Sequence, residues 1–141
     1  MSDDGRAVEA ITRIVLQHYP SAQAIYLFGS FATEDEWPDS DVDVAVLLSP
    51  EESRKVGSLA MSALHLSLES SLRKDVDVIN VRLVSTVFQK EIVMADRRIY
   101  TADRFAAEEF EMLTLSYYQK LNEERAGIIE QGLKDGRFHK V

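Results

Sequence analysis

The fold is decided by the run Asp41–Leu48, which reads Asp-Val-Asp-Val-Ala-Val-Leu-Leu and is closed by Ser49-Pro50. A run so rich in β-branched residues and bounded by turn-forming residues predicts a β-strand. Side chains at positions i and i+2 of a strand share a face, so Asp41 and Asp43 present two carboxylates side by side. Two like charges this close raise each other's pKa and destabilise the fold unless a cation or a strong donor compensates them. The run therefore predicts a strand with a cation-binding edge.

Three other stretches predict strands that can pair with this one. Residues 23–28 are apolar and aromatic and break at Gly29, as a buried strand that ends in a tight turn does. Residues 75–81 predict a third strand, and the short apolar patch 98–101 predicts an edge strand. Asp77 lies inside the third strand, where a charged side chain has few structural reasons to be. If that strand neighbours residues 41–48, the three acidic side chains converge.

Helical spacing of apolar residues separates the strands. It predicts helices over residues 4–18, 51–73 and 84–95, and a long helix from an N-cap at Asp103 that weakens around Gly127, Gly132 and Gly136. Residues 30–40 are polar and predict a connection or a short helix. Helices that alternate with strands indicate an α/β fold, with a small sheet flanked by helices and a long C-terminal helix. We expect one domain over residues 1–141.

The long helix carries an apolar stripe formed by Phe105, Phe110, Leu113, Tyr117 and Leu121. Such a stripe is usually core. A helix from residue 103 to about residue 126 would be roughly 36 Å long, about the span of a small domain, so part of the stripe is expected to protrude. Core packing and a surface for a partner or a second copy of the chain are both open at this point.

Composition limits the classes of function. The formal net charge of −8 argues against direct nucleic-acid binding, which requires clustered cations to neutralise phosphates. There is no cysteine, which excludes disulfides and thiolate metal sites. No apolar stretch has the roughly 20 residues of a membrane helix, and residues 1–5 lack the basic charge of a secretion signal. We expect a cytoplasmic protein.

Gly29 and Ser30 supply a second half to the predicted site. Phosphate groups require exposed backbone N–H groups, close approach of the main chain and a small hydroxyl donor, and glycine followed by serine permits all three. Their position at the end of a strand favours binding of an anion there. Mg2+ takes oxygen ligands, commonly one or two carboxylates together with nucleotide phosphates, so the acids and the glycine-serine bend suit one ligand.

The combined pattern is Gly29-Ser30, ten intervening residues, Asp41-Val42-Asp43 and a later aspartate in a β run. It resembles the nucleotidyltransferase superfamily of the DNA polymerase β type, and the short chain and the stretch 38–46 are similar to the minimal nucleotidyltransferases (MNT). The resemblance covers residues 20–82 in detail and implies a small mixed β-sheet. Asp75 would share a face with Asp77, and only the match of residues 77–79 to the family's strand favours Asp77.

The resemblance implies transfer of AMP from ATP to a hydroxyl, with release of pyrophosphate. Gly29 and Ser30 would hold the triphosphate, Asp41 and Asp43 the metal, with two Mg2+ ions expected, and Asp77 would complete metal binding or take the proton of the acceptor. MNT proteins of this length commonly act as antitoxins of HEPN-domain ribonuclease toxins, in some cases by adenylylating a tyrosine of the toxin. The chain departs from the family where an Arg-Gly pair often follows the Gly-Ser, because residues 31–36 contain no arginine.

Two other functions are compatible with the sequence. A chain with this fold could neutralise its partner by binding alone, and the missing arginine favours that hypothesis. A transferase acting on a small-molecule alcohol is the other alternative, although longer relatives with an added domain suit it better.

Overall fold

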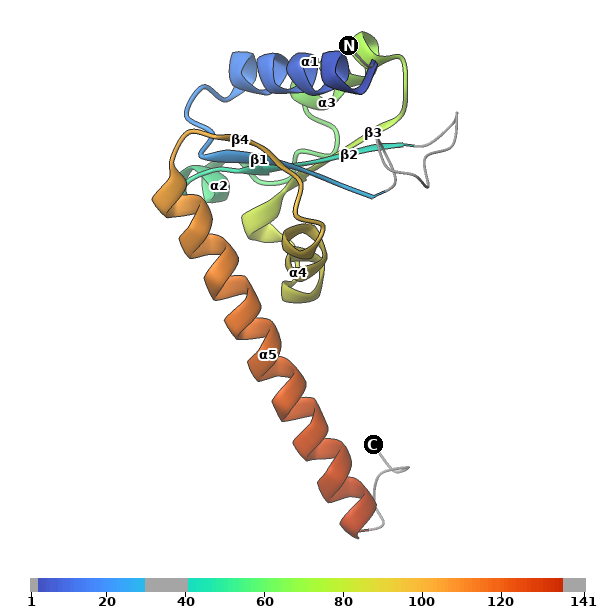
Figure 1. The fold of residues 1–141 in the computed structure, drawn as a ribbon, viewed down its shortest axis with the longest axis vertical. Helices are drawn as coiled ribbons and strands as arrows, with labels where there is room; N and C mark the ends of the chain where they lie inside the picture. Colours follow the sequence, from blue (N-terminus) through green and yellow to red (C-terminus); the bar gives the residue numbers. More distant parts are fainter. Residues whose placement is uncertain (1–2, 30–40, 136–141) are drawn as a thin grey trace.

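A computed structural model describes residues 3–29 and 41–135, which form one four-stranded sheet with helices on both faces (Figure 1). The elements, in chain order, are α1 (Asp3–His18), β1 (Ala24–Phe28), β2 (Val42–Leu47), α2 (Pro50–Val56), α3 (Ala63–Leu72), β3 (Val76–Asn80), the 3₁₀ helix η1 (Val81–Leu83), α4 (Thr86–Met94), β4 (Arg98–Thr101) and α5 (Arg104–Asp135). The predicted α/β class, all four predicted strands and the long C-terminal helix are confirmed. Residues 30–40, predicted as a connection or a short helix, lie outside the described residues.

The sheet is mixed, and its strand order is β3-β2-β1-β4. β1 pairs antiparallel with both β2 and β4, whereas β2 and β3 run parallel. The parallel pair is possible because α2 and α3 cross over between its strands, as parallel neighbours require. This order places the two strands that carry the predicted acids next to each other.

Each face of the sheet has its own apolar core. On one face, α1 and α3 pack on a cluster that includes Ile11, Val15, Val44, Val46 and Leu68. On the other face, α4 and α5 cover a smaller cluster, which includes Tyr26, Ala45, Leu47, Ile92 and Phe110 (Figure 1). The buried side chains alternate along β2 between the two clusters, as the period of a strand demands. Asp43 therefore shares its face with Ala45 and Leu47, on the side of α4 and α5.

The single helix predicted over residues 51–73 is wrong, because the structure divides it into α2 and α3. α2 ends at Gly57, whose φ of 70° lies in the left-handed region and whose N–H donates to the Ser53 carbonyl at 3.0 Å. α3 begins after Ser62, whose side chain accepts from the His65 N–H at 3.1 Å. Apolar residues at helical spacing continue across the break because Leu59, in the intervening turn, is buried as well.

Helix α5 begins as predicted and ends later than predicted. The Asp103 carboxylate accepts from the Ala106 N–H at 3.0 Å, which confirms the N-cap. The expected weakening at Gly127 and Gly132 is wrong, since the helix continues to Asp135, whereas Gly136 lies outside the described residues. A glycine inside a helix costs about 1 kcal/mol relative to alanine, and the good helix formers around these glycines offset that cost.

The 32 residues of α5 span about 48 Å at the rise of an α-helix. Only its first turns lie against the sheet and α4, and the remainder extends away from the domain (Figure 1). Phe110 of the predicted stripe is buried, but Phe105, Leu113 and Tyr117 are exposed. Plain core packing thus accounts for one part of the stripe and not for the rest. Within residues 3–29 and 41–135, no helix combines the length and apolarity that crossing a membrane requires.

Candidate active site

Two of the predicted acids lie side by side at one end of the sheet. In the parallel pairing of β2 and β3, Asp43 is the direct partner of Asp77, and adjacent strands lie only about 4.8 Å apart. The two carboxyl groups are hydrogen-bonded to each other. Asp75, the alternative to Asp77, precedes β3, and its carbonyl accepts from the Val42 N–H at 2.9 Å. The register therefore places Asp77, rather than Asp75, against Asp43.

The environment raises the pKa of Asp43 from its ordinary 3.8 to about 6. Burial is the largest cause, because the side chain is partly removed from water. The hydrogen bond to Asp77, the charge of Asp77 and the charge of Asp41 act in the same direction, and the charge of Arg97 opposes them. A carboxyl group with a raised pKa among other acids is the electrostatic signature of a site that a cation would stabilise.

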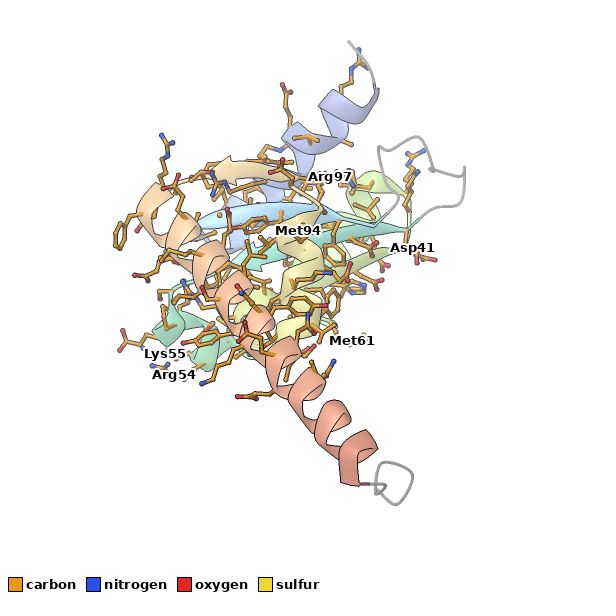
Figure 2. The ribbon with its side chains drawn as sticks, turned by 60° about the horizontal axis from the view of Figure 1, so that its bottom comes forward. Asp41, Arg54, Lys55, Met61, Met94 and Arg97 are labelled. Carbon is orange, nitrogen blue, oxygen red and sulfur yellow. The ribbon has the colours of Figure 1, made fainter. Side chains whose placement is uncertain are left out.

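Asp41 is exposed and lies directly before β2 (Figure 2). The register of β2 and β3 places the other two acids at the same end of the sheet. The charge of Asp41 reaches Asp43, but in the described part of the chain no three His, Cys, Asp or Glu side chains are gathered closely enough to hold a metal ion by themselves. Mg2+ usually needs only one or two protein carboxylates and takes its other ligands from phosphates and water. The pair Asp43 and Asp77, with Asp41 nearby, fits that donor set.

Gly29 closes the site from the neighbouring strand. It follows β1 with a φ of 75°, in the left-handed region that favours glycine. A Cβ atom at this position would lie 2.0 Å from the Asp43 Oδ2, so the carboxylate occupies the space that any side chain would need. The predicted contact between the glycine bend and the acids is present in the structure. Ser30 lies outside the described residues.

Apolar rings cover the sheet face beside the acids. Phe28 is the antiparallel partner of Asp43 and therefore shares its face. Its ring packs edge-on against Phe88 of α4, with a centroid separation of 5.5 Å. These rings form an apolar neighbour for the carboxyl pair, which is consistent with burial as the leading cause of the raised pKa of Asp43.

Arg97 is a site residue that the sequence did not reveal. It lies just before β4, and its Nη1 donates to the Gly29 carbonyl at 3.2 Å. Its own carbonyl accepts from the Leu27 N–H at 2.9 Å, which fixes its backbone beside β1. Its charge acts on Asp43. The signal in the sequence was a cation directly before the predicted edge strand, but only the strand order shows that this strand pairs with β1.

The comparison with known families agrees with this geometry. The family model described as polymerase beta, nucleotidyltransferase matches residues 9–105, which include Gly29, all three acids and Arg97. The chain belongs to this nucleotidyltransferase family. The mixed sheet, with Gly29 directly after β1 and the predicted acids at the start of β2 and β3, lies within the residues that the family model matches.

Several relatives of this nucleotidyltransferase are characterised. A protein adenylyltransferase, MntA, from Shewanella oneidensis is 32% identical over 120 residues, which cover 85% of this chain and 83% of that protein. A crystal structure of a toxin-antitoxin with AMP-PNP contains a chain that is 31% identical, with a TM-score of 0.71 over 89% of this chain and 98% of that one. A structure of a tri-AMPylated Shewanella oneidensis HEPN toxin in complex with its MNT antitoxin gives 30% identity and a TM-score of 0.70, over 92% of this chain and 98% of that one.

Proposed function

We propose that this nucleotidyltransferase transfers AMP from ATP to a tyrosine hydroxyl of a HEPN-family ribonuclease toxin and thereby acts as the antitoxin. The observation that carries the proposal is the contact of Asp43 with both Asp77 and Gly29, in a chain 32% identical to a protein adenylyltransferase. In the reaction, the acceptor oxygen bonds to the α-phosphorus of ATP, the bond to pyrophosphate breaks, and the hydroxyl proton leaves. Because the reaction needs ATP, we place it in the cytoplasm.

Each site residue has a role in this proposal. Asp41, Asp43 and Asp77 would hold Mg2+, with two ions expected, and bound Mg2+ neutralises charge on the phosphates and on the attacking and leaving oxygens. Gly29 and Ser30 would offer the triphosphate a close approach to the main chain. Asp77 is more exposed than Asp43, which makes it the better placed of the two to take the acceptor proton.

Arg97 supplies the cation that residues 31–36 lack. Its guanidinium already contacts the Gly29 carbonyl at the bend proposed to bind phosphates, and a guanidinium binds phosphate oxygens through planar, charge-assisted hydrogen bonds. The missing arginine in the loop had favoured a chain that neutralises its partner by binding alone. A cation at the same bend from a different part of the chain removes that reason.

The test is to incubate the full chain, labelled ATP and Mg2+ with a HEPN-family toxin as the acceptor. The wild-type chain is expected to label the toxin, and the variant with both Asp41→Asn and Asp43→Asn is expected to lose at least about 100-fold in rate, since metal and phosphate stabilisation is a large part of such catalysis. Both substitutions keep the size of the side chain, so that loss of folding can be checked separately by thermal unfolding.

A toxicity assay in cells with the same double variant decides between an enzyme and a chain that neutralises its partner by binding alone. If the double variant still suppresses the toxin in cells as the wild type does, neutralisation is by binding and the proposal is wrong. In a separate measurement of nucleotide affinity, Arg97→Ala is expected to weaken binding of ATP more than binding of AMP, because Arg97 lies at the bend proposed to bind the triphosphate and AMP has a single phosphate. Labelling of a small alcohol in place of the toxin would identify the other class of acceptor.

A further inference from the structure

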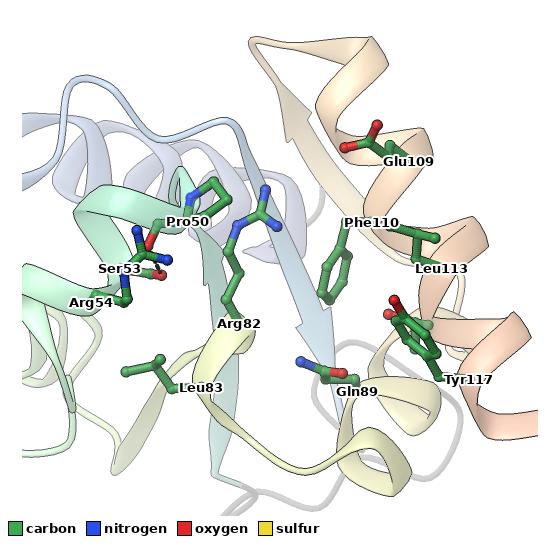
Figure 3. A pocket seen from close by; sticks show the side chains of 11 residues that line it. Pro50, Ser53, Arg54, Arg82, Leu83, Gln89, Glu109, Phe110, Leu113 and Tyr117 are labelled. Atoms are coloured by element: carbon green, nitrogen blue, oxygen red, sulfur yellow. Dashed lines mark hydrogen bonds between the residues drawn. The ribbon is translucent and has the colours of Figure 1, made fainter. Parts of the chain in front are cut away.

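A cavity of about 280 Å³ lies at the end of the sheet opposite the acids, between α2, η1, α4 and α5 (Figure 3). Its lining includes Arg54, Arg82, Glu109, Phe110, Leu113 and Tyr117. β2 leads from Asp43 to the edge of this cavity at Leu48, five residues further on, which is about 17 Å along an extended strand. The cavity is therefore separate from the proposed transfer site, although both open on the face of the sheet that α4 and α5 cover.

Arg82 is the main polar group of this cavity. Its Nε donates to the Leu48 carbonyl and its Nη2 to the Gln23 Oε1 at 2.8 Å, while its guanidinium carbon lies 5.7 Å from the centre of the Phe110 ring. All these partners are neutral, and among residues 3–29 and 41–135 no carboxylate lies within ion-pair distance of it. These bonds use two of the five N–H donors of a guanidinium. The side chain is only partly exposed, and burial lowers its pKa against the weaker, opposite effect of the Glu109 charge.

A partly buried cation without an ion-pair partner favours an anion in the adjoining space, because a charge-assisted hydrogen bond in a partly desolvated site is stronger than a neutral one. Figure 3 shows Arg82 extending from η1 toward the space between α2 and α5, with the Phe110 ring facing it. Arg54 of α2 adds a second cation to the lining, against one carboxylate from Glu109. The local charge is thus positive on a chain whose formal net charge is −8.

The cavity continues into an apolar ridge on α5. Leu113 and Tyr117 line the cavity and are 40% and 59% exposed, and Leu83 of η1, on the opposite side, is 48% exposed. Phe110, Leu113, Tyr117 and Leu121 follow one another at spacings of three and four residues, so they form one stripe along the helix. A small anion would fill the cavity and leave this ridge exposed to water. A polypeptide segment with an acidic side chain and apolar neighbours would cover both the cavity and the ridge.

We propose that this surface, which we call the α2/α5 groove (Arg54, Arg82, Leu83, Phe110, Leu113 and Tyr117), is the docking surface for the toxin. The identity of the partner rests on the proposed function. The occupant is a segment of the toxin that presents a carboxylate to Arg82 and Arg54, with apolar side chains on either side to pack on Leu113 and Tyr117. The docking surface and the proposed transfer site then lie at opposite ends of the sheet. Figure 2 shows Arg54 and Lys55 of α2 far from Asp41.

The test measures affinity for the same HEPN-family toxin, with full-length proteins, by titration calorimetry at low and at high salt. The double variant Leu113→Asp, Tyr117→Asp is expected to raise Kd by at least about 30-fold, since tyrosine and its apolar neighbours at the centre of an interface carry most of its affinity. Arg54→Ala is expected to raise Kd by roughly threefold at low salt and less at high salt, as an exposed ion pair would. The affinity for ATP is expected to stay within about twofold of wild type in each variant, because the groove is about 17 Å from Asp43 along β2.

Met112→Asp is the matched control, because Met112 is an apolar, 61% exposed residue of the same helix that points about 140° away from Tyr117. Its Kd is expected to stay near that of wild type. The assignment is overturned if the wild-type chain forms no complex with the toxin, if the double variant binds as wild type does, or if Met112→Asp weakens binding equally. A dimer of the chain alone that Tyr117→Asp dissociates would show that the groove serves self-association instead.

These results are separable from those of the transfer assay. A toxin that docks through the groove but receives no AMP would contradict the proposed function and leave the docking surface intact. AMP transfer to a toxin that binds the double variant with unchanged affinity would do the reverse.

Discussion

Gly29 and Asp43 are in contact between adjacent strands, and each limits what the other position can hold. The φ of Gly29 is 75°, and a Cβ there would lie 2.0 Å from the Asp43 Oδ2. Any side chain at residue 29 must therefore accept an unfavourable backbone and also displace the carboxylate. Gly57 has nearly the same φ, 70°, but a Cβ on Gly57 would meet no other atom within 4 Å. A substitution at Gly57 therefore tests backbone strain alone, whereas one at Gly29 tests backbone strain together with the steric contact with Asp43.

We predict that Gly29→Ala lowers the free energy of unfolding by about 1–3 kcal/mol and also abolishes detectable AMP transfer, since the new methyl group displaces Asp43. The matched Gly57→Ala should lose roughly 1–2 kcal/mol of stability from the same backbone strain and keep wild-type transfer. Urea unfolding and the labelling assay measure the two effects. Comparable transfer by both variants would show that the contact with Asp43 has no role in the reaction.

The raised pKa of Asp43 also predicts that the stability of the fold depends on pH in the absence of divalent metal. Its folded-state pKa, about 6, lies above its ordinary 3.8, so the folded chain binds this proton more tightly than the unfolded chain does. The resulting stabilisation is complete below about pH 4 and is lost as the pH rises through about 6. Because the Asp43 side chain is partly exposed, screening by solvent reduces this stabilisation.

Urea unfolding at about pH 4.5 and about pH 7.5 checks the sign. The free energy of unfolding of the wild type should fall more between these pH values than that of Asp43→Asn, which carries no titrating group at this position. Carboxylates far from Asp43 contribute equally in both proteins and cancel, so the difference reports Asp43 together with the acids that interact with it. An equal pH dependence in the two proteins would exclude a raised pKa at Asp43.

At the scale of elements, a small polar cluster fastens α5 to the sheet. The Glu111 carboxylate accepts from the Tyr26 hydroxyl at 2.6 Å and from Arg98 Nη1 at 2.7 Å, so one side chain of α5 bonds to both β1 and β4. Burial and the Glu111 charge raise the pKa of Tyr26, which keeps its hydroxyl protonated as the donor. By contrast, Glu108 pairs with Arg104 on the same helix, and both side chains are mostly exposed.

Glu111→Ala should therefore destabilise the fold by about 1–3 kcal/mol, because it leaves the partly buried Tyr26 hydroxyl and the Arg98 guanidinium without their acceptor. The control Glu108→Ala removes an exposed pair and should cost less than about 0.5 kcal/mol. Chemical denaturation measures both values. Similar losses in the two variants would mean that the cluster does not anchor α5.

Most of the helices and strands could be predicted from the sequence. The strands followed from β-branched, apolar and aromatic runs, and Asp103 indicated the start of α5. The break between α2 and α3 was missed because buried Leu59 continues the apolar pattern, although Gly57 and Ser62 were the signals that end one helix and begin the next. The glycines of α5 were given too much weight, since a long helix of favourable residues tolerates them.

The site was predictable only as far as local spacing extends. Gly29, Asp41 and Asp43 lie close together in sequence, and Asp77 was placed on the condition that its strand be a neighbour, which the register satisfies. Arg97 was not identified, because its position beside Gly29 depends on the pairing of β1 with β4. The α2/α5 groove was also unforeseen, since it joins segments more than 20 residues apart in sequence.

At the scale of the whole molecule, the two ends of the sheet differ in their charge and in the surfaces that they expose. The acids gather at the start of β2 and β3, where a bound cation would lower their mutual repulsion. The opposite end carries Arg82 and the exposed apolar ridge of α5. A protein that lies along the α4 and α5 face can reach both ends at once, whereas a small alcohol would use only the first.

The parallel register of β2 and β3 has one more consequence. A slip of a single residue in β3 would turn Asp77 toward α1 and α3, burying a charge among Val44 and Val46, and would carry an apolar neighbour out to solvent. A misaligned chain would lose its chemistry and its stability in the same step. The Asp77 carboxylate, proposed above as a catalytic group, would thus also disfavour misaligned pairing of β3 with β2.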